Sequence, residues 1–295
     1  MCGRFVLAYS TEDLLSEFEV DHVVEAGPAP SWNVAPTQRV RIVIERYDGG
    51  SVSGGEIFCS HAPGGHIPSN ENDASLGNTP VRLLRTARWG LVPHWAKDRS
   101  IGQKMINARS ETVAVKPAFR AAAARRRCLV PANGYFEWMA DSIDGKGGAG
   151  GGAGNGGKTP YYLHDPEDAV LAMAGLYEIW RDDSLPEDHP DHLLLTTTVI
   201  TRAAPDALGH IHDRSPVVVP RDLREDWLNC GPTQSNGGSK AGAGGEGDAP
   251  GAAELLAAIP PPTLVPREVG KAVGNVRNNS PSLIEPAPAG VNGLF

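Results

Sequence analysis

The chain has 295 residues and a mass of 31.2 kDa, with 40% hydrophobic residues and a net charge of −8. This length and apolar content suffice for a hydrophobic core, which excludes a fibre, a coiled-coil array and a fully disordered chain. The sequence has no run of about 18 consecutive apolar residues, and its first residues lack the basic start and the cleavage site of a signal peptide. We therefore expect a cytoplasmic protein without a membrane segment.

The predicted elements describe a mixed fold in which strands outnumber helices. The chain begins with a strand at 3–8, and Ser10 with Asp13 has the spacing of a capping box at the start of a helix. Two further segments with helical periodicity are 116–127 and 221–228. Six short runs rich in branched and aromatic residues are predicted as strands: 40–46, 128–130, 135–138, 161–164, 170–177 and 193–200.

Three segments of low apolar content interrupt these elements. Segment 48–80 mixes Gly, Ser, Asn and Pro, whereas 144–158 has nine glycines in fifteen residues and 231–252 has eight in twenty-two. We expect a long loop at the first and disordered surface insertions at the other two. The rest is predicted to form a single α+β domain at 2–290, built on a mainly antiparallel, barrel-like β-sheet with flanking helices.

The four cysteines are Cys2, Cys59, Cys128 and Cys230, and no two of them form a CxxC pair. In a reducing cytosol this spacing indicates neither a disulfide framework nor a thiolate zinc site. The sequence also lacks an HExxH motif. We expect neither a metal nor an organic cofactor.

Positive charge is concentrated in one part of this acidic chain. Segment 82–127 contains twelve Lys or Arg residues against two acidic ones, Asp98 and Glu111. Such a segment can be an ordinary solvated face or a surface that follows nucleic-acid phosphates. Its composition alone does not decide between the two.

Cys2 becomes the first residue of the chain if the initiator methionine is removed. It then carries an α-amine and a thiol on adjacent carbons, with usual pKa values near 8 and about 8.5, so both nucleophiles are partly available at neutral pH. No other residue in a protein offers this 1,2-aminothiol. A cysteine at position two can equally be an incidental buried residue.

Six motifs accompany Cys2 along the chain: MCGRF at 1–5, WNVAPT at 32–37, RWGLVPHW at 88–95, NARSET at 107–112, PANGYFEW at 131–138 and HDRSP at 212–216. In this order they resemble the SRAP family, the SOS response-associated peptidases, which are abasic-site processing proteins. The resemblance extends to 283–286. It implies that Cys2 captures the aldehyde of an abasic site in single-stranded DNA as a covalent thiazolidine, which shields the lesion during the DNA damage response. It also implies that the protein removes Met1 itself, acts as a monomer and joins the nucleoid when bound to DNA.

The resemblance implies further catalytic residues. Asn107 corresponds to an asparagine that hydrogen-bonds the Cys2 amine or the sugar, and Glu137 to a glutamate that carries protons during imine formation. His212 corresponds to the histidine that helps to open the sugar; His210 competes with it, but only His212 has Arg two positions later and Pro four positions later. On residue type alone, Asn107 could cap a turn and Glu137 could be a buried ion-pair partner.

The remaining expectations concern contacts with DNA. Trp89 could instead belong to the core, because tryptophans are more often buried than exposed. Ser215 stands where the family commonly has methionine, which puts the packing beside His212 in question. The expected contacts are Arg4, Arg88 and Arg109 to phosphates, Trp89 to a base, and Thr201 near the substrate.

Two other classes of function fit parts of the sequence. An N-terminal-nucleophile peptidase or amidohydrolase would use Cys2, Glu137 and His212 on a peptide or amide bond without any DNA. A non-catalytic single-strand binder would use the basic segment and would not depend on Cys2.

Overall fold

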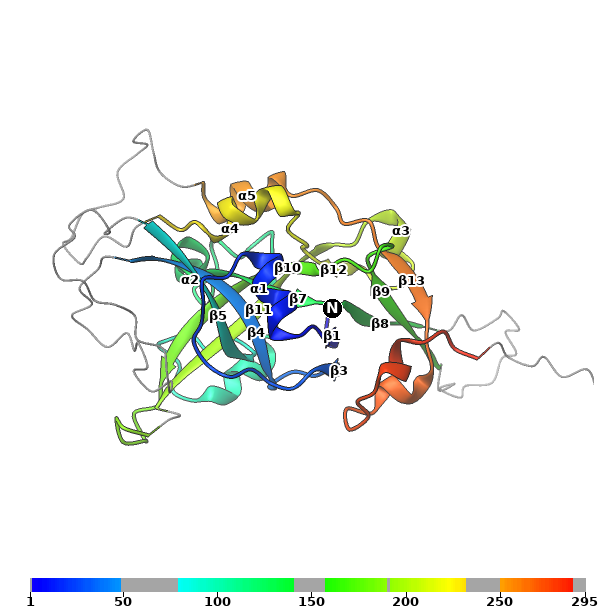
Figure 1. Cartoon of the computed structure of the whole chain (residues 1–295), viewed down its shortest axis with the longest axis horizontal. Coiled ribbons are helices and arrows are strands. Elements are labelled where there is room, and N and C mark those ends of the chain that lie inside the picture. The colour runs from blue at the N-terminus through cyan, green and yellow to red at the C-terminus, as the bar shows by residue number, and fades with distance from the viewer. Residues whose placement is uncertain (1, 49–78, 141–156, 190–191, 232–249, 289–295) are drawn as a thin grey trace, which may run out of the picture.

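The computed structural model describes residues 2–48, 79–140, 157–189, 192–231 and 250–288 (Figure 1). Within these residues the chain forms two β-sheets with short helices packed around them. Among the helices that the structure describes, none combines the length and the apolar character that spanning a bilayer would require.

The smaller sheet holds the start of the chain in its interior. Its strands run in the order β13-β9-β8-β1-β3, so β1 has a neighbour on both edges, and every pairing is antiparallel. The five strands are β1 (Phe5–Leu7), β3 (Ser31–Val34), β8 (Gly134–Ala140), β9 (Lys158–His164) and β13 (Val265–Glu268).

The larger sheet closes into a barrel. Its order is β12-β11-β10-β7-β4-β5-β2, and a further parallel pairing of β11 with β5 joins Thr196 to Arg88 and Thr197 to Trp89. The strands β11, β10, β7, β4 and β5 therefore form a closed ring. The sheet consists of β2 (His22–Val23), β4 (Arg39–Asp48), β5 (Thr79–Trp89), β6 (Asn107–Arg109), β7 (Arg127–Ala132), β10 (Leu171–Arg181), β11 (Leu193–Ala203) and β12 (Arg214–Pro216).

The period of two along the barrel strands divides their apolar side chains between two clusters. Ile42 and Ile44 pack in the same cluster as Cys2, whereas Val43 packs with residues of four helices. All three are fully buried. The Cys2 cluster therefore fills the barrel interior, and the helices cover its outer face.

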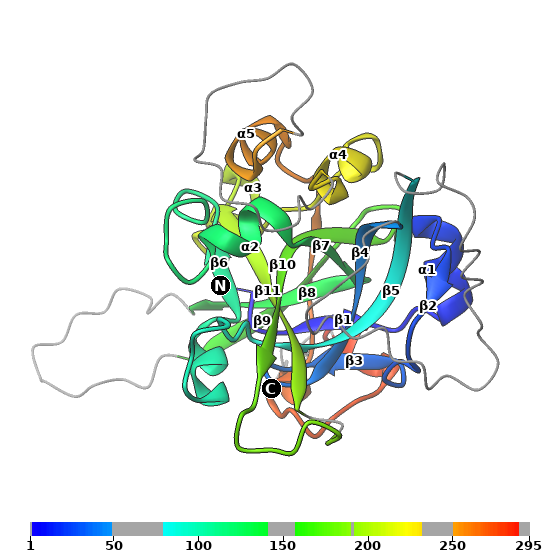
Figure 2. The ribbon, with the colours of Figure 1, turned by 90° about the vertical axis from the view of Figure 1, so that its left-hand side faces the viewer.

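Within the described part of the chain, five α-helices and four 3-10 helices lie around the sheets. Figure 2 shows α2, α4 and α5 gathered on one side of the barrel, while α1 lies next to β2 and β5. They are α1 (Thr11–Phe18), α2 (Arg120–Arg125), α3 (Asp206–Gly209), α4 (Arg224–Leu228), α5 (Ala252–Ala258), η1 (Arg99–Lys104), η2 (Arg221–Leu223), η3 (Lys271–Gly274) and η4 (Pro281–Ile284).

The predicted fold class is confirmed: this is an α+β fold on a mainly antiparallel, barrel-like sheet with flanking helices. The capping box of α1 is formed, with Ser10 accepting from the Asp13 amide and the Asp13 carboxylate accepting from the Ser10 amide. The helix expected at 116–127 is shorter, because its start at Phe119 has no side-chain cap and Arg127 already belongs to β7.

Other element boundaries also differ from expectation. The helix expected at 221–228 is divided between η2 and α4, and strand β5 was not predicted. The segments 48–80, 144–158 and 231–252 lie almost entirely outside the described residues. At their described ends they contribute to β4, β5, β9 and α5. The domain limits of 2–290 stay a prediction.

The approach of Gly90 to Gly102 fixes η1 against the closed ring. Gly90 has φ +121°, and a Cβ at this position would lie 2.5 Å from the Gly102 carbonyl oxygen. We expect Gly90→Ala to lower the free energy of unfolding by about 1–3 kcal/mol, because the variant combines strain with a clash. Urea denaturation measures this change. The control is Gly274→Ala, where an added Cβ meets nothing within 4 Å; equal stabilities of the two variants would contradict the interpretation.

Candidate active site

The first residues of the chain are fixed between the two sheets. Phe5 pairs with Tyr135 of β8 and with Val34 of β3, and the Phe136 amide donates to the Arg4 carbonyl at 2.8 Å. The Phe5 ring packs edge-on against Trp89 of the barrel, with ring centroids 4.9 Å apart. Cys2 is thereby completely buried.

Asn107 connects Cys2 to the larger sheet. It lies on the short strand β6, which runs parallel to β11 with Asn107 opposite Val199. The Asn107 Nδ2 donates to the Cys2 carbonyl at 2.7 Å, while its Oδ1 is buried and accepts no hydrogen bond from any described residue. The side chain thus holds Cys2 and still offers an acceptor.

The Cys2 thiol is held in its neutral form. Burial raises its pKa, and the negative charge of Glu137 raises it further. The sequence led us to expect a thiol that is partly ionised at neutral pH, and this expectation is corrected because the side chain is fully desolvated. The nucleophilic sulfur therefore brings a proton of its own to any reaction.

Glu137 lies near this thiol, and His212 lies near Glu137. Glu137, on β8, is 5% exposed, and burial raises the pKa of its carboxyl group while the His212 charge acts in the opposite direction. The charge of Glu137 raises the pKa of the Cys2 thiol, and the charge of His212 lowers the pKa of Glu137. The three side chains therefore belong to one site. Tyr135 is the fourth member, and burial, Cys2 and Glu137 all raise the pKa of its hydroxyl.

The His212 ring is oriented by its own loop. Its Nδ1 accepts the Arg214 amide hydrogen at 3.0 Å and lies 2.9 Å from the Asp213 Oδ1. These two contacts to Nδ1 fix the orientation of the ring. Ile211 packs in the Cys2 cluster and brings the loop to the site, whereas His210 is exposed at the end of α3.

An ion pair joins two of the sequence motifs. The Arg214 guanidinium donates to both carboxylate oxygens of Glu111, at 2.6 and 2.9 Å, and also to the carbonyl of the fully buried Thr201. Arg214 lies two residues after His212, so this pair positions the histidine loop against the turn that follows β6. Thr201 thus supports the site from within the barrel wall, and the sequence did not reveal the role of Glu111.

Two expected DNA contacts are already engaged within the protein. The Arg4 guanidinium donates to the Asn33 Oδ1 at 2.7 Å and to the Val273 carbonyl at 3.0 Å. Trp89 is completely buried, and its Nε1 donates to the Ile106 carbonyl at 2.9 Å. In this conformation Trp89 has no ring face for a base, because β5 directs its side chain into the barrel.

Other residues of the basic segment are exposed without protein partners. Arg109 is exposed, and neither it nor Arg88 forms an ion pair or a side-chain hydrogen bond within the part of the chain described here. Trp95 is 52% exposed, and its loop is held by the Trp180 Nε1, which donates to the Ala96 carbonyl at 2.7 Å. An exposed ring near free cations was expected at Trp89 and is found at Trp95.

Ser215 occupies a packing position. It is 1% exposed on β12, opposite Arg202, and its Oγ has no hydrogen-bond partner among the described residues. The departure from methionine therefore changes the packing beside His212 and removes no proton-carrying group.

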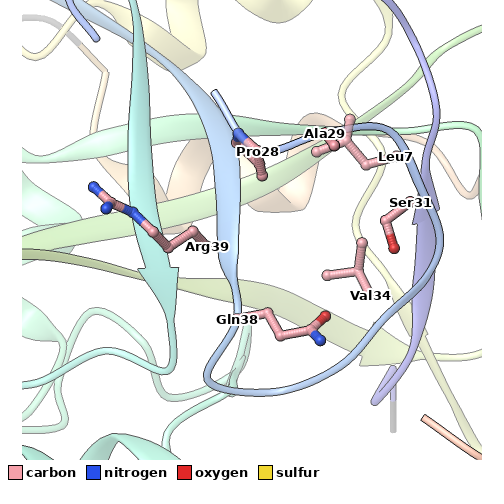
Figure 3. A pocket seen from close by; sticks show the side chains of 7 residues that line it. All are labelled: Leu7, Pro28, Ala29, Ser31, Val34, Gln38 and Arg39. Carbon is pink, nitrogen blue, oxygen red and sulfur yellow. The ribbon is translucent and has the colours of Figure 1, made fainter. Parts of the chain in front are cut away.

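An apolar pocket of about 220 Å³ lies between β1, β3 and the start of β4 (Figure 3). It contains none of the four candidate catalytic residues. Within the described ranges, no group of three or more His, Cys, Asp or Glu side chains is placed to bind a metal ion. The pocket is lined by Leu7, Pro28, Ala29, Ser31, Val34, Gln38 and Arg39.

Comparison with known proteins identifies the family. The family model described as "SOS response associated peptidase (SRAP)" matches residues 1–276. The chain belongs to the SRAP family. The resemblance inferred from the six motifs is thereby confirmed.

Relatives of this SRAP chain cover most of its length. It is 35% identical over 230 residues to the abasic site processing protein YoaM of Bacillus subtilis, covering 78% of this chain and 79% of the relative. It is 32% identical over 286 residues to YoqW of the same organism, covering 97% and 99% of the two chains. The crystal structure of a protein from Bacteroides thetaiotaomicron shares the fold, with a TM-score of 0.64 and 20% identity over 97% of this chain and all of that one.

The Glu111–Arg214 pair of the SRAP chain makes a testable contribution to stability. The guanidinium lowers the pKa of Glu111 from its usual 4.5 to about 2. A carboxylate with a lowered pKa in the folded state stabilises the fold above pH 4.5 and loses this effect as the pH falls towards 2. We expect Glu111→Gln to lower the free energy of unfolding by about 1 kcal/mol at pH 7, with a smaller difference near pH 3.

Urea denaturation of both proteins at the two pH values measures this effect. The matched control is Glu254→Gln on α5, where the carboxylate is exposed and forms no ion pair with a described residue. A difference for Glu111→Gln that stays constant from pH 7 to pH 3 would show that the lost stability does not come from the ion pair.

Proposed function

We propose that this protein processes abasic sites in single-stranded DNA by forming a covalent thiazolidine between Cys2 and the lesion. The observation that carries the proposal is the position of Cys2: it lies at the start of the chain, with its carbonyl held by Asn107 and its thiol beside Glu137. The relatives named abasic site processing proteins, YoaM and YoqW, support the choice of substrate.

The proposed reaction begins after the loss of Met1 exposes the Cys2 amine. The amine adds to the C1′ aldehyde of the open sugar, and loss of one water gives an imine. The Cys2 S–H then adds across the C=N bond, with sulfur bonding to carbon and the proton ending on nitrogen. The product is a five-membered ring, and its formation from neighbouring groups is favoured by proximity.

Glu137 is the proposed proton carrier. Dehydration of the carbinolamine requires a proton on the departing hydroxyl, and a carboxyl group with a raised pKa can hold one near neutral pH. Burial supplies this shift at Glu137. The unpaired Oδ1 of Asn107 is an acceptor for an amine or for a sugar hydroxyl, and it does not titrate.

His212 is proposed to open the closed sugar. The Arg214 amide and the Asp213 carboxylate both contact Nδ1 and orient the ring, and Nε2 is the nitrogen proposed to exchange a proton with the sugar. The ring is partly exposed, with 30% of its side-chain surface accessible. It can therefore meet a substrate while Arg214 and Glu111 position its loop.

We propose DNA contacts for side chains that have no hydrogen-bond or ion-pair partner among the described residues. Arg88 and Arg109 are offered to phosphates, and Trp95 is offered to an unstacked base, which favours single-stranded over fully paired DNA. Arg4, Trp89 and Thr201 are proposed to support the site from behind, because their polar groups or rings are engaged within the protein. Contacts to the backbone make the recognition tolerant of sequence.

The setting of the reaction is proposed to be the cytoplasm and, once DNA is bound, the nucleoid, where damage-associated gaps expose single strands. Action as a monomer is part of the same proposal. Release of Met1 by the protein itself also remains part of the proposal. A peptidase acting on other proteins is less well supported, because burial holds the Cys2 thiol in its neutral, weakly nucleophilic form.

The crosslink is tested with single-stranded DNA that contains one abasic site. We expect a covalent product that survives denaturation, has the mass of the two components minus one water, and contains protein without Met1. Cys2→Ser should abolish this product, whereas the control Cys230→Ser should not. Denaturing electrophoresis and mass spectrometry provide the readouts.

Two outcomes would overturn this function. Retention of Met1 in active protein would exclude a ring that includes the amine. A Cys2→Ser protein that still binds single strands, together with a wild-type protein that gives no covalent product, would instead favour the non-catalytic binder.

If Glu137 carries the proton, its replacement should slow crosslinking without weakening DNA binding. Glu137→Gln keeps the size of the side chain but cannot carry the proton, so we expect crosslinking to slow by about 10²-fold at neutral pH. Affinity for undamaged single-stranded DNA should stay unchanged. Single-turnover rates and fluorescence anisotropy measure the two quantities, and an equal loss of both would indicate a structural defect instead.

A further inference from the structure

An arginine cluster outside the active site forms no ion pair with a described residue, although the charge of Arg99 acts on the carboxyl groups of Asp98 and Asp182. Arg39 on β4 stands directly opposite Arg88 on β5, in the register of an antiparallel pair. Like charges placed directly opposite each other destabilise a sheet. Arg99, the first residue of η1, is close enough for its charge to join burial in lowering the pKa of Arg88. We call Arg39, Arg88 and Arg99 the arginine cluster.

These side chains lie on the outer wall of the barrel. Val40 and Trp89, which follow Arg39 and Arg88 in sequence, both pack in the interior cluster with Cys2. Alternation along a strand then places Arg39 and Arg88 outside. Figure 3 shows the Arg39 side chain extending from β4 towards the neighbouring strand and away from the apolar pocket. The approach of Gly90 to Gly102 holds η1, and with it Arg99, against the end of β5.

The acidic groups around the arginine cluster have other partners. Glu25 accepts from the Arg85 Nε at 3.0 Å and from the Thr86 amide at 2.7 Å. Asp98 accepts from the Ser100 amide, and Asp182 from Ser184. No ion pair to Arg39, Arg88 or Arg99 occurs within the described residues.

One atom of the cluster is particularly informative. The Arg88 Nη1 is buried, and it has no hydrogen-bond partner in the described part of the chain. A buried donor without a partner costs about 1–3 kcal/mol, more for a charged group, unless a ligand satisfies it. A guanidinium pairs with phosphate oxygens through two parallel hydrogen bonds, so a phosphate is the natural ligand here.

We propose that the arginine cluster binds a backbone phosphate of the same DNA strand, at a nucleotide away from the abasic site. This inference rests on the proposed function and extends it to the outer wall of the barrel. Arg88 and Trp89 connect the arginine cluster to the Cys2 site. Trp89 contacts Phe5 near Cys2, while the neighbouring Arg88 faces outward. A strand held at Cys2 would thus continue across the end of β5.

The test compares Arg39→Gln/Arg99→Gln with Arg120→Gln/Arg125→Gln. Both double variants remove two positive charges, and all four residues are exposed. The control pair lies on α2 and forms no ion pair in the described ranges. Fluorescence anisotropy with an undamaged 20-nucleotide strand gives the affinity at several salt concentrations. Each phosphate contact contributes about 0.7 to the slope of log affinity against log salt.

We expect the cluster variant to lower this slope by about 1 and the control variant to leave it unchanged. At saturating abasic DNA, the crosslinking rate of the cluster variant should equal that of wild type. With an abasic strand of three nucleotides, wild type and variant should also crosslink equally at subsaturating DNA, because the proposal assigns the cluster to a phosphate outside so short a strand.

The outcomes separate this inference from the proposed function. If both double variants show the same slope of log affinity against log salt, while wild type binds and crosslinks normally, the arginine cluster does not bind a phosphate. The proposed function would be unaffected by this result. A slower crosslink with the three-nucleotide strand would place the cluster's effect within the active site and would also overturn the inference. Wild-type protein that neither binds nor crosslinks DNA would overturn the proposed function itself. Thermal melting of each variant confirms that it is folded.

Discussion

The site depends on how firmly the beginning of the chain is held. The first residues of most proteins are poorly ordered, because they lack neighbours on one side. Here β1 lies between two strands, Phe5 packs against Trp89, and the Asn107 amide holds the Cys2 carbonyl at 2.7 Å. An amine at a fixed position reacts with a bound aldehyde as if at very high concentration. In the proposed reaction, the two sheets would therefore hold the Cys2 amine in a fixed position.

Burial of that end sets the protonation of the site. It raises the pKa of the Cys2 thiol and of the Glu137 carboxyl, so both groups favour their neutral forms more than they would in water. Imine and ring formation need protons to be moved between groups, without any net charge being created. A site of neutral groups suits this chemistry. Attack on a peptide bond by a free thiolate would need a lower thiol pKa, so we propose the crosslink ahead of general peptidase activity.

The sequence predicted the members of the site better than their contacts. Cys2 was a candidate from its position, Asn107, Glu137 and His212 were candidates from the resemblance to the SRAP family, and their catalytic roles stay predictions. The Glu111–Arg214 pair was not predicted, since 103 residues separate its partners and only the pairing of β11 with β6 and β12 brings them together. Strand β5 was missed because arginines at every third position, as at Arg85 and Arg88, break the alternation that marks a strand.

The same limit applies to the two tryptophans of one motif. Trp89 and Trp95 are six residues apart, and composition gives no reason to distinguish them. Trp89 ends a strand that pairs with β4 and β11, so its side chain enters the barrel, whereas Trp95 follows in a loop and is 52% exposed. The aromatic contact with DNA that we expected at Trp89 is therefore proposed for Trp95 instead.

The contacts also explain how an acidic protein can bind DNA. A net charge of −8 repels a polyanion at long range, so binding must rely on a few cations placed close together. Several arginines of the basic segment, such as Arg82, Arg85 and Arg126, are neutralised by carboxylates and contribute little to such a field. Arg88, Arg99 and Arg109 are not, and they lie on the strands and turns that also carry Trp95 and Asn107. Arg88 and Arg109, which lie on β5 and β6, are therefore the cations that the proposed DNA contacts use.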